Sequence, residues 1–138
     1  MQLVDKAIDA CVAAIEIYNK PDFRYREEAF SILMFNAWEL LLKARVLKGN
    51  RGDPRSIEIW EPVRKKDGTN SKRSKVKLNR SKSAMTIDCI RAAALVRGYA
   101  MDNINDACID NLNLLAEVRD SCVHLALVGP GLGKRIPG

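Results

Sequence analysis

Apolar residues recur every three or four positions in four segments of the chain, which is the spacing of helices that bury one face. This spacing predicts helices over about residues 3–18, 26–48, 84–97 and 104–128. The second segment is apolar on nearly all sides, as expected for a helix at the centre of a bundle. We therefore predict an all-α, up-and-down bundle of four main helices.

Helix-breaking and helix-capping residues separate these segments. Pro21 ends the first helix because proline cannot continue the hydrogen-bond ladder, and Gly98 is a natural end for the third. Ser83 can cap the third helix with its hydroxyl oxygen. In the fourth helix we expect an inward apolar stripe, formed by Ile104, Cys108, Leu112, Leu115, Val118, Cys122 and Leu125.

The apolar spacing changes between the second and third helices. Residues 56–63 alternate in the period of a strand, and residues 76–78 do so briefly after the turn-prone residues 67–70. We therefore predict a β-hairpin inserted at about residues 55–80.

The length of the chain fits one domain, because 138 residues are enough to bury a core without disulfides. We expect a helical domain over residues 1–128 and a linker or tail over residues 129–138, which are rich in turn residues and lack periodicity. This tail is expected to be the truncated start of a further region.

The positive charge of the chain is local. The net charge is +6, but residues 45–82 hold 13 Lys/Arg and 4 Asp/Glu, a net charge of +9, while the remainder holds 10 and 13, a net charge of −3. The basic residues of the hairpin, among them Lys72, Arg73 and Lys75, are candidates for binding RNA phosphates. A solvated loop is the alternative, because Trp60 is the only aromatic residue nearby for base stacking.

No metal site and no cofactor are expected. The four cysteines form no C-x-x-C pair, and the chain has a single histidine. All four lie in apolar helical patterns, where free cysteine acts as a small buried residue, and this favours a reducing, cytoplasmic setting. No segment has the roughly 18 apolar residues of a membrane span, so no membrane partner is expected.

The single histidine lies near the end of the last predicted helix. At about 100° per residue, Asp120 and His124 share one face, and Arg119 lies about 140° round from His124. An imidazole can exchange protons near neutrality, a carboxylate can orient it, and a guanidinium can bind phosphate. These three residues are therefore candidates for a catalytic site. A surface or interface histidine is the alternative.

A polar stripe interrupts the apolar second helix. Asn36, Glu39 and Lys43 are spaced three and four residues apart, so they lie on one side of the helix. One interpretation is a solvated strip with a Glu39–Lys43 ion pair. The other is that Asn36 and Glu39 face the same cavity as His124 and support a site there.

The residues around the histidine also carry a resemblance. Arg119-Asp120-x-x-x-His124, late in the last long helix, resembles the R-x4-6-H signature of the HEPN superfamily, whose commonest form has Asn or Asp after the arginine. Residues 36–44 look like the apolar early helix of that superfamily, and residues 17–28 are similar to an uncharacterised bacterial group assigned to it. The basic hairpin departs from the minimal HEPN bundle.

The resemblance implies a metal-independent endoribonuclease that acts at a two-fold dimer interface, in a toxin–antitoxin, phage-defence or CRISPR-linked system. Arg119 and His124 would be the catalytic pair, and Asp120 the polar residue between them. A homodimer through the last long helix is expected, with an antitoxin or a C-terminal domain as a further partner. Some HEPN members have lost activity and bind RNA or nucleotides instead.

Cleavage of RNA requires few residue types. The 2′-hydroxyl is the nucleophile, so a protein must remove its proton, stabilise charge on phosphorus and protonate the leaving 5′-oxygen. Two copies of His124 and Arg119 about a two-fold axis could supply these groups. Three hypotheses follow: this RNase, which leaves a 2′,3′-cyclic phosphate; a non-catalytic module that binds RNA or a nucleotide; and a helical dimerisation domain of a larger protein.

Overall fold

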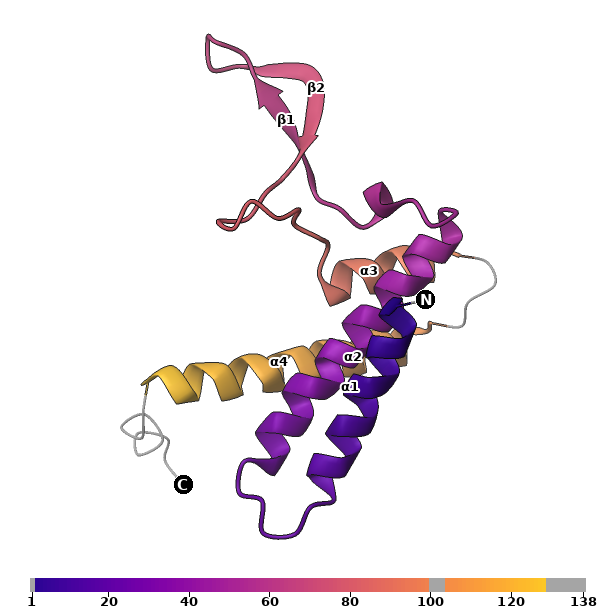
Figure 1. Ribbon diagram of the computed structural model, residues 1–138, viewed down its shortest axis with the longest axis vertical. Coiled ribbons are helices and arrows are strands. Elements are labelled where there is room, and N and C mark those ends of the chain that lie inside the picture. Colours follow the sequence, from indigo (N-terminus) through magenta and orange to yellow (C-terminus); the bar gives the residue numbers. More distant parts are fainter. Residues whose placement is uncertain (1, 100–103, 129–138) are drawn as a thin grey trace.

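The chain is mostly helical, with a small β-hairpin between the second and third long helices, as predicted. The computed structural model describes residues 2–99 and 104–128, and side chains as far as Cys122. None of the described helices is long and apolar enough to cross a membrane. In chain order the elements are α1 (Gln2–Tyr18), α2 (Arg26–Gly49), the 3-10 helix η1 (Pro54–Ser56), β1 (Trp60–Arg64), β2 (Asn70–Val76), α3 (Cys89–Arg97) and α4 (Asp106–Val128) (Figure 1).

α1 and α2 form an antiparallel pair joined by a short loop (Figure 1). The face that α1 turns toward α2 is made of small residues, since Ala7 and Ala14 are buried, and this allows a close approach of the two helices. Near the loop, the rings of Tyr18 and Phe30 lie 5.1 Å apart, centroid to centroid, and extend the contact.

The core is built around α2, which confirms the central position predicted for this helix. α2 packs against α1, α3 and α4, whereas α1 packs only against α2 among the described residues. Leu42 and Val46 of α2 are 3% and 1% exposed. They form one cluster with the buried side chains of the later helices, namely Cys89, Ala92, Ala93 and Val96 of α3 and Leu112 of α4.

α4 crosses the α1–α2 pair at a steep angle, and its C-terminal half extends past α2 on the side away from α1 (Figure 1). The inward stripe predicted for α4 is therefore only partly buried. Leu112 is 3% exposed and Leu115 packs against the core, but Val118 is 41% exposed. Leu125 lies outside the residues whose side chains the structure describes.

The third helix starts later than predicted, and Ser83 does not cap it. α3 begins at Cys89, and its cap is Asp88, whose Oδ1 accepts a hydrogen bond from the backbone N–H of Arg91 at 2.8 Å. Residues 84–87 are extended instead, because their backbone groups pair with the hairpin: the N–H of Ile87 donates to the carbonyl of Ile57 at 2.9 Å. The apolar residues among positions 84–87 have the spacing of a helix. The spacing does not reveal the strand-like pairing, because the partner residues are distant in the chain.

Three chain segments meet at the root of the hairpin. Ile59 donates its N–H to the carbonyl of Met85 (2.9 Å), Met85 donates to Lys77 (2.8 Å), and Lys77 donates back to Ile59 (2.7 Å). These bonds form a closed backbone ring. The hairpin is thus attached to the segment that leads into α3, and through it to the helical body.

The two strands of the hairpin are antiparallel, with Trp60 opposite Val76 and Arg64 opposite Asn70. Gly68, in the turn, has a φ of +87°, a conformation that favours glycine. The second strand was predicted over residues 76–78, but it begins at Asn70, because backbone pairing rather than an apolar face holds it. Lys72, Arg73 and Lys75 consequently lie within β2.

Replacement of Leu42 by alanine should lower the free energy of unfolding by about 2–5 kcal/mol, because the change leaves a cavity in the core. Leu41, the next residue of α2, is 44% exposed. Leu41→Ala should therefore cost less than half as much. Urea denaturation of both variants, followed by helical circular dichroism, makes the comparison, and equal losses would contradict the orientation of α2.

Candidate functional site

The guanidinium of Arg119 is held between a ring and a carboxylate. Its Cζ atom lies 4.2 Å from the centroid of the Phe35 ring, which is 5% exposed on α2. Its Nη2 and Nε atoms donate to Oδ1 of Asp120 at 2.7 and 3.1 Å. Because the Arg119 side chain is only 36% exposed, these contacts position a partly desolvated cation at the edge of the core.

Among the described residues, the hydrogen-bond partner of the Asp120 carboxylate is therefore the guanidinium of Arg119. Its side chain is 55% exposed, and Oδ2 has no hydrogen-bond partner among the described residues. α4 continues as a helix through Val128, so Asp120 and His124 are one turn apart on the same face. The side chain of His124 lies outside the described residues, and its role stays a prediction.

The polar stripe of α2 contacts the extended segment that precedes α3. Nζ of Lys43 lies 3.7 Å from Oε2 of Glu39, which confirms the predicted i,i+4 pair. The same Nζ donates a hydrogen bond to Oγ1 of Thr86 at 2.8 Å. Asn36 is exposed. The stripe is thus neither wholly solvated nor a complete site, since Lys43 bonds the side chain of Thr86, in the segment that precedes α3, and Glu39 pairs with Lys43.

The charges of this stripe and of Arg119 surround one buried thiol. The pKa of Cys89 is raised to about 12, mainly by burial. The carboxylates of Glu39 and Asp88 add to this rise, and the cations Lys43 and Arg119 oppose it. Glu39 and Arg119, which the sequence named as separate candidates, therefore lie in one electrostatic neighbourhood.

Sequence patterns did not identify two residues of this neighbourhood, Phe35 and Asp88. Phe35 carries no signal there, because an aromatic residue in a nearly all-apolar helix indicates only core packing. Asp88 follows Ile87 directly, and the helical spacing of that region made it appear to be an ordinary exposed position. An N-cap search at Asp88, rather than at Ser83, would have found it.

Two acidic residues at the start of α2, Glu27 and Glu28, lie near α4, closer to the C-terminal end of that helix than Arg119 does. The pKa of Cys122 is raised, first by burial and then by Glu28 and Glu27. Oε2 of Glu28 is buried and has no hydrogen-bond partner among the described residues. The first turn of α2 therefore lies beside α4 at the level of Cys122. The sequence did not indicate this contact, because the helix dipole alone accounts for acids in a first turn.

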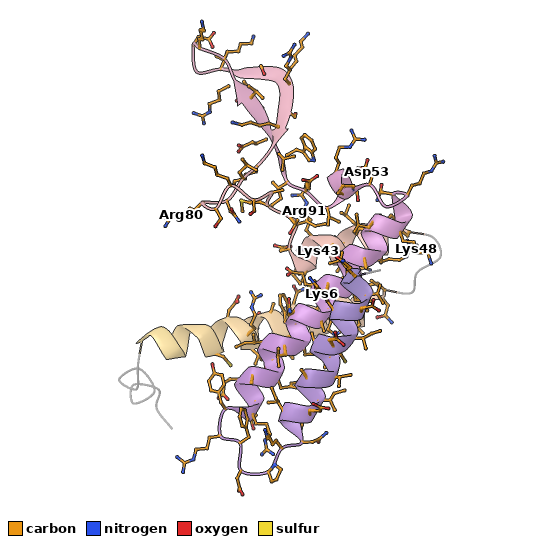
Figure 2. The ribbon with its side chains drawn as sticks, viewed as in Figure 1. Lys6, Lys43, Lys48, Asp53, Arg80 and Arg91 are labelled. Carbon is orange, nitrogen blue, oxygen red and sulfur yellow. The ribbon has the colours of Figure 1, made fainter. Side chains whose placement is uncertain are left out.

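The hairpin presents its cations away from the helices. Lys72, Arg73 and Lys75 are exposed, and they lie on the hairpin, which projects away from the helices (Figure 2). Of these three residues, only Lys75 has an ion pair among the described residues, with Nζ 4.0 Å from Oε1 of Glu61. Two strands that carry mostly uncompensated cations form a surface suited to a polyanion.

Further basic residues lie between the tip of the hairpin and the helical body (Figure 2). In Figure 2, Arg80 and Arg91 lie on the hairpin side of α4, and Lys43 lies on α2 below Arg91. Within the residues that the structure describes, no group of three or more His, Cys, Asp or Glu side chains is placed to hold a metal ion. Arg80 and Arg91 are exposed and can attract anions.

Comparison with known proteins places nearly the whole chain in one family. Residues 2–136 match the family model described as "Domain of unknown function (DUF3644)". No curated protein and no solved structure was found to match.

The free energy of unfolding should fall as the pH rises above about 9. The Cys89 thiol ionises at its ordinary pKa of 9.0 in the unfolded chain but only at about 12 in the folded one. Between these values the unfolded state loses the proton and becomes favoured. Urea denaturation of wild type and Cys89→Ala at about pH 8 and about pH 10 tests this, and the variant should show a smaller loss. The same loss in both proteins would contradict the assignment.

Proposed function

We propose that this chain, which belongs to the family of the Domain of unknown function (DUF3644), is a metal-independent endoribonuclease of HEPN type. The proposed reaction cleaves RNA through its 2′-hydroxyl and leaves a 2′,3′-cyclic phosphate and a 5′-hydroxyl. The observation that carries the proposal is the fixed guanidinium of Arg119, stacked on Phe35 and bonded to Asp120, on the helix that leads to His124.

In this reaction the chain would supply proton transfer and charge stabilisation. His124 removes the proton of the 2′-hydroxyl, the oxygen attacks phosphorus, and the bond to the 5′-oxygen breaks as that oxygen receives a proton. Arg119 binds the non-bridging phosphate oxygens. Its Nη1 atom has no hydrogen bond among the described residues, so a phosphate can bind there while Nε and Nη2 stay on Asp120.

A homodimer through α4 would provide the second histidine. One imidazole cannot easily serve as base and acid on opposite sides of an in-line reaction, whereas two copies about a two-fold axis can. The exposure of Leu114 (58%) and Val118 (41%), on a helix that projects beyond α2, supports contact with another surface. In this proposal α1 and α2 are the antiparallel part of a HEPN-like bundle, and the second copy completes the bundle against α4, which crosses them.

The hairpin favours a second candidate function, an RNA- or nucleotide-binding module without cleavage. This function needs only the exposed cations, because phosphate contacts give affinity that does not depend on sequence. In either case we propose a cytoplasmic bacterial protein of a toxin or phage-defence system, with an antitoxin or a C-terminal domain as a further partner. Asn36 and Glu39 remain supporting candidates.

Purified wild-type protein should cleave labelled RNA in excess chelator, and His124→Ala and Arg119→Ala should each reduce the rate by about 10²–10⁴, because each removes a group that acts in the transition state. Arg24→Ala, in the exposed α1–α2 loop, is the matched control and should keep the rate. RNA with a 2′-deoxy residue at the cleaved position should resist. Retention of the wild-type rate by His124→Ala would eliminate the proposed mechanism.

Neutralising the hairpin should weaken RNA binding in a salt-dependent way. The triple variant Lys72→Gln, Arg73→Gln and Lys75→Gln should reduce the slope of log affinity against log salt by about 2 for single-stranded RNA. The control replaces three exposed lysines of the helical body with glutamine, namely Lys6, Lys20 and Lys48. Fluorescence anisotropy at several salt concentrations measures both, and equal slopes would remove the hairpin as the binding surface.

A further inference from the structure

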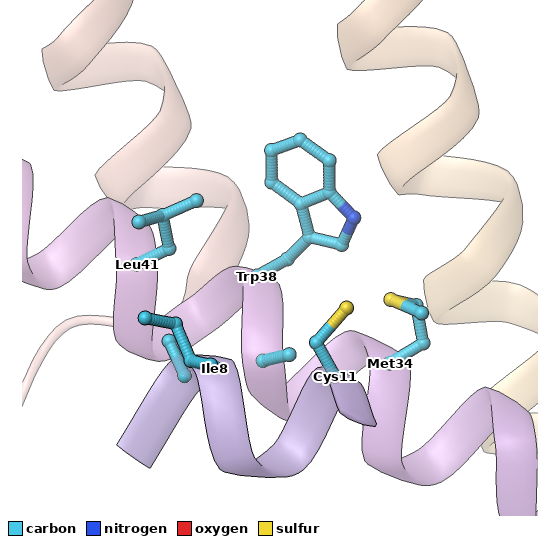
Figure 3. A pocket seen from close by; sticks show the side chains of 7 residues that line it. Ile8, Cys11, Met34, Trp38 and Leu41 are labelled. Carbon is cyan, nitrogen blue, oxygen red and sulfur yellow. The ribbon is translucent and has the colours of Figure 1, made fainter. Parts of the chain in front are cut away.

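The two tryptophans of the chain have different surroundings. Trp38, on α2, packs against the buried core and lines a pocket of about 250 Å³ between α1 and α2, together with Cys11 and Met34 (Figure 3). Trp60, the first residue of β1, is 43% exposed and, among the described residues, takes no part in that packing. The helical core therefore accounts for the position of Trp38 but not for that of Trp60.

The indole of Trp60 is nevertheless held in place. Its Nε1 donates a hydrogen bond to the backbone carbonyl of Arg55 at 3.3 Å, and its backbone lies opposite Val76 of β2. This hydrogen bond satisfies the one polar group of the indole, so what the residue offers to a partner is its apolar ring. A flat ring that is fixed at one edge and open to solvent is a surface on which another flat ring can stack.

Trp60 belongs to the exposed face of the hairpin. Side chains alternate between the two faces of a strand, and in β1 the alternate residues Trp60, Pro62 and Arg64 are exposed, whereas the two residues between them are half-buried. Glu61, the one acid within the two strands, therefore lies on the other face, where its Oε1 is 4.0 Å from Nζ of Lys75. The exposed face of β1 thus combines an aromatic ring with a cation and carries no carboxylate.

The charge of the hairpin is strongly positive. Residues 60–77 hold seven Lys/Arg and two Asp/Glu, a net charge of +5. Both acids are engaged within the hairpin, because Glu61 pairs with Lys75 and Oδ1 of Asp67 accepts two hydrogen bonds from Thr69 in the turn. The excess of cations is therefore available to an anionic partner.

The hairpin contributes nothing to the hydrophobic core. No residue of β1 or β2 is buried, and a two-stranded hairpin is by itself marginally stable at best in water. Ordering its residues costs conformational entropy that no core contact of the strands offsets. A ring and a set of cations on an element that projects from the body (Figure 1) are thus placed for contact with another molecule.

The ring discriminates between the anionic partners that these cations would attract. An acidic protein segment needs the cations but gains little from a flat ring. A membrane surface needs several large apolar side chains, whereas the exposed face of β1 offers one. A nucleic acid supplies both phosphates and planar bases. In a duplex the bases are already stacked on one another, so a single strand is the form that presents a base to an indole.

We infer that the exposed face of the hairpin binds single-stranded RNA by stacking one base on Trp60, while Arg64 and the neighbouring cations bind phosphates. Stacking at Trp60 rests on the RNA binding proposed above, and it adds the class of RNA and the residue that selects this class. It does not require cleavage. It reads no sequence, since every base has a face that can stack.

Three probes separate stacking from charge. They are a single strand of about 12 nucleotides, a duplex of the same sequence, and an abasic strand with the same number of phosphates. All three carry 2′-O-methyl groups, so that no 2′-hydroxyl is available for cleavage. Fluorescence anisotropy with the full chain measures the affinity for each probe.

Trp60→Leu should weaken binding of the single strand at least about fivefold, because one stacked base is lost, and should leave the affinities for the abasic strand and the duplex unchanged. Trp60→Phe, which keeps a ring, should retain most of the affinity. Tyr25→Leu, at a 47% exposed aromatic position before α2, is the matched control and should leave all three affinities unchanged. Equal weakening of all three probes by Trp60→Leu, or no weakening of the single strand, would overturn the inference.

The outcomes also separate stacking from the proposed function. Salt-dependent binding of the single strand that is insensitive to Trp60→Leu would overturn stacking and leave the proposed RNA binding intact. Absence of binding to every nucleic-acid probe would overturn both. Tighter binding of polyglutamate or of phosphatidylserine vesicles than of the single strand would overturn RNA as the partner of the hairpin.

Discussion

The fold depends on the burial of α2, a long helix that is apolar on nearly all sides. Such a helix cannot shield itself from water, so it needs neighbours on several sides. α1 covers one side through Ala7 and Ala14, and α3 and α4 cover another with the cluster around Cys89. The segment before α3 covers the side of Glu39 and Lys43 only in part, through Thr86. The side that carries Met34, Trp38 and Leu41 remains open, so an apolar surface follows from incomplete coverage of one helix.

The position of Arg119 is a consequence of the same packing. Phe35 is 5% exposed and belongs to the core, yet one face of its ring supports the guanidinium. A cation stacked on a ring keeps its N–H groups free at the edges, where Asp120 occupies part of them. The core therefore gives Arg119 a fixed orientation at little conformational cost, which is what a phosphate-binding group requires.

The basic charge of the molecule is concentrated on the hairpin. The hairpin has few side-chain contacts of its own, and a closed ring of backbone hydrogen bonds among Ile59, Lys77 and Met85 attaches it to the body. Its exposed cations would attract an anionic partner.

The order of helices and hairpin, the central position of α2 and the Glu39–Lys43 pair were predictable from the sequence, because each depends on residues close in the chain. The start of α3 was not, since residues 84–87 have helical spacing but pair with backbone groups of the hairpin. Of the candidate site, spacing indicated Arg119 and Asp120, whereas the contact between Arg119 and Phe35 arose only from packing. The sequence by itself determined which residues share one face of a helix. Only the tertiary structure decided what each face meets, because the angles at which α1 and α4 cross α2 depend on side chains that are far apart in the chain.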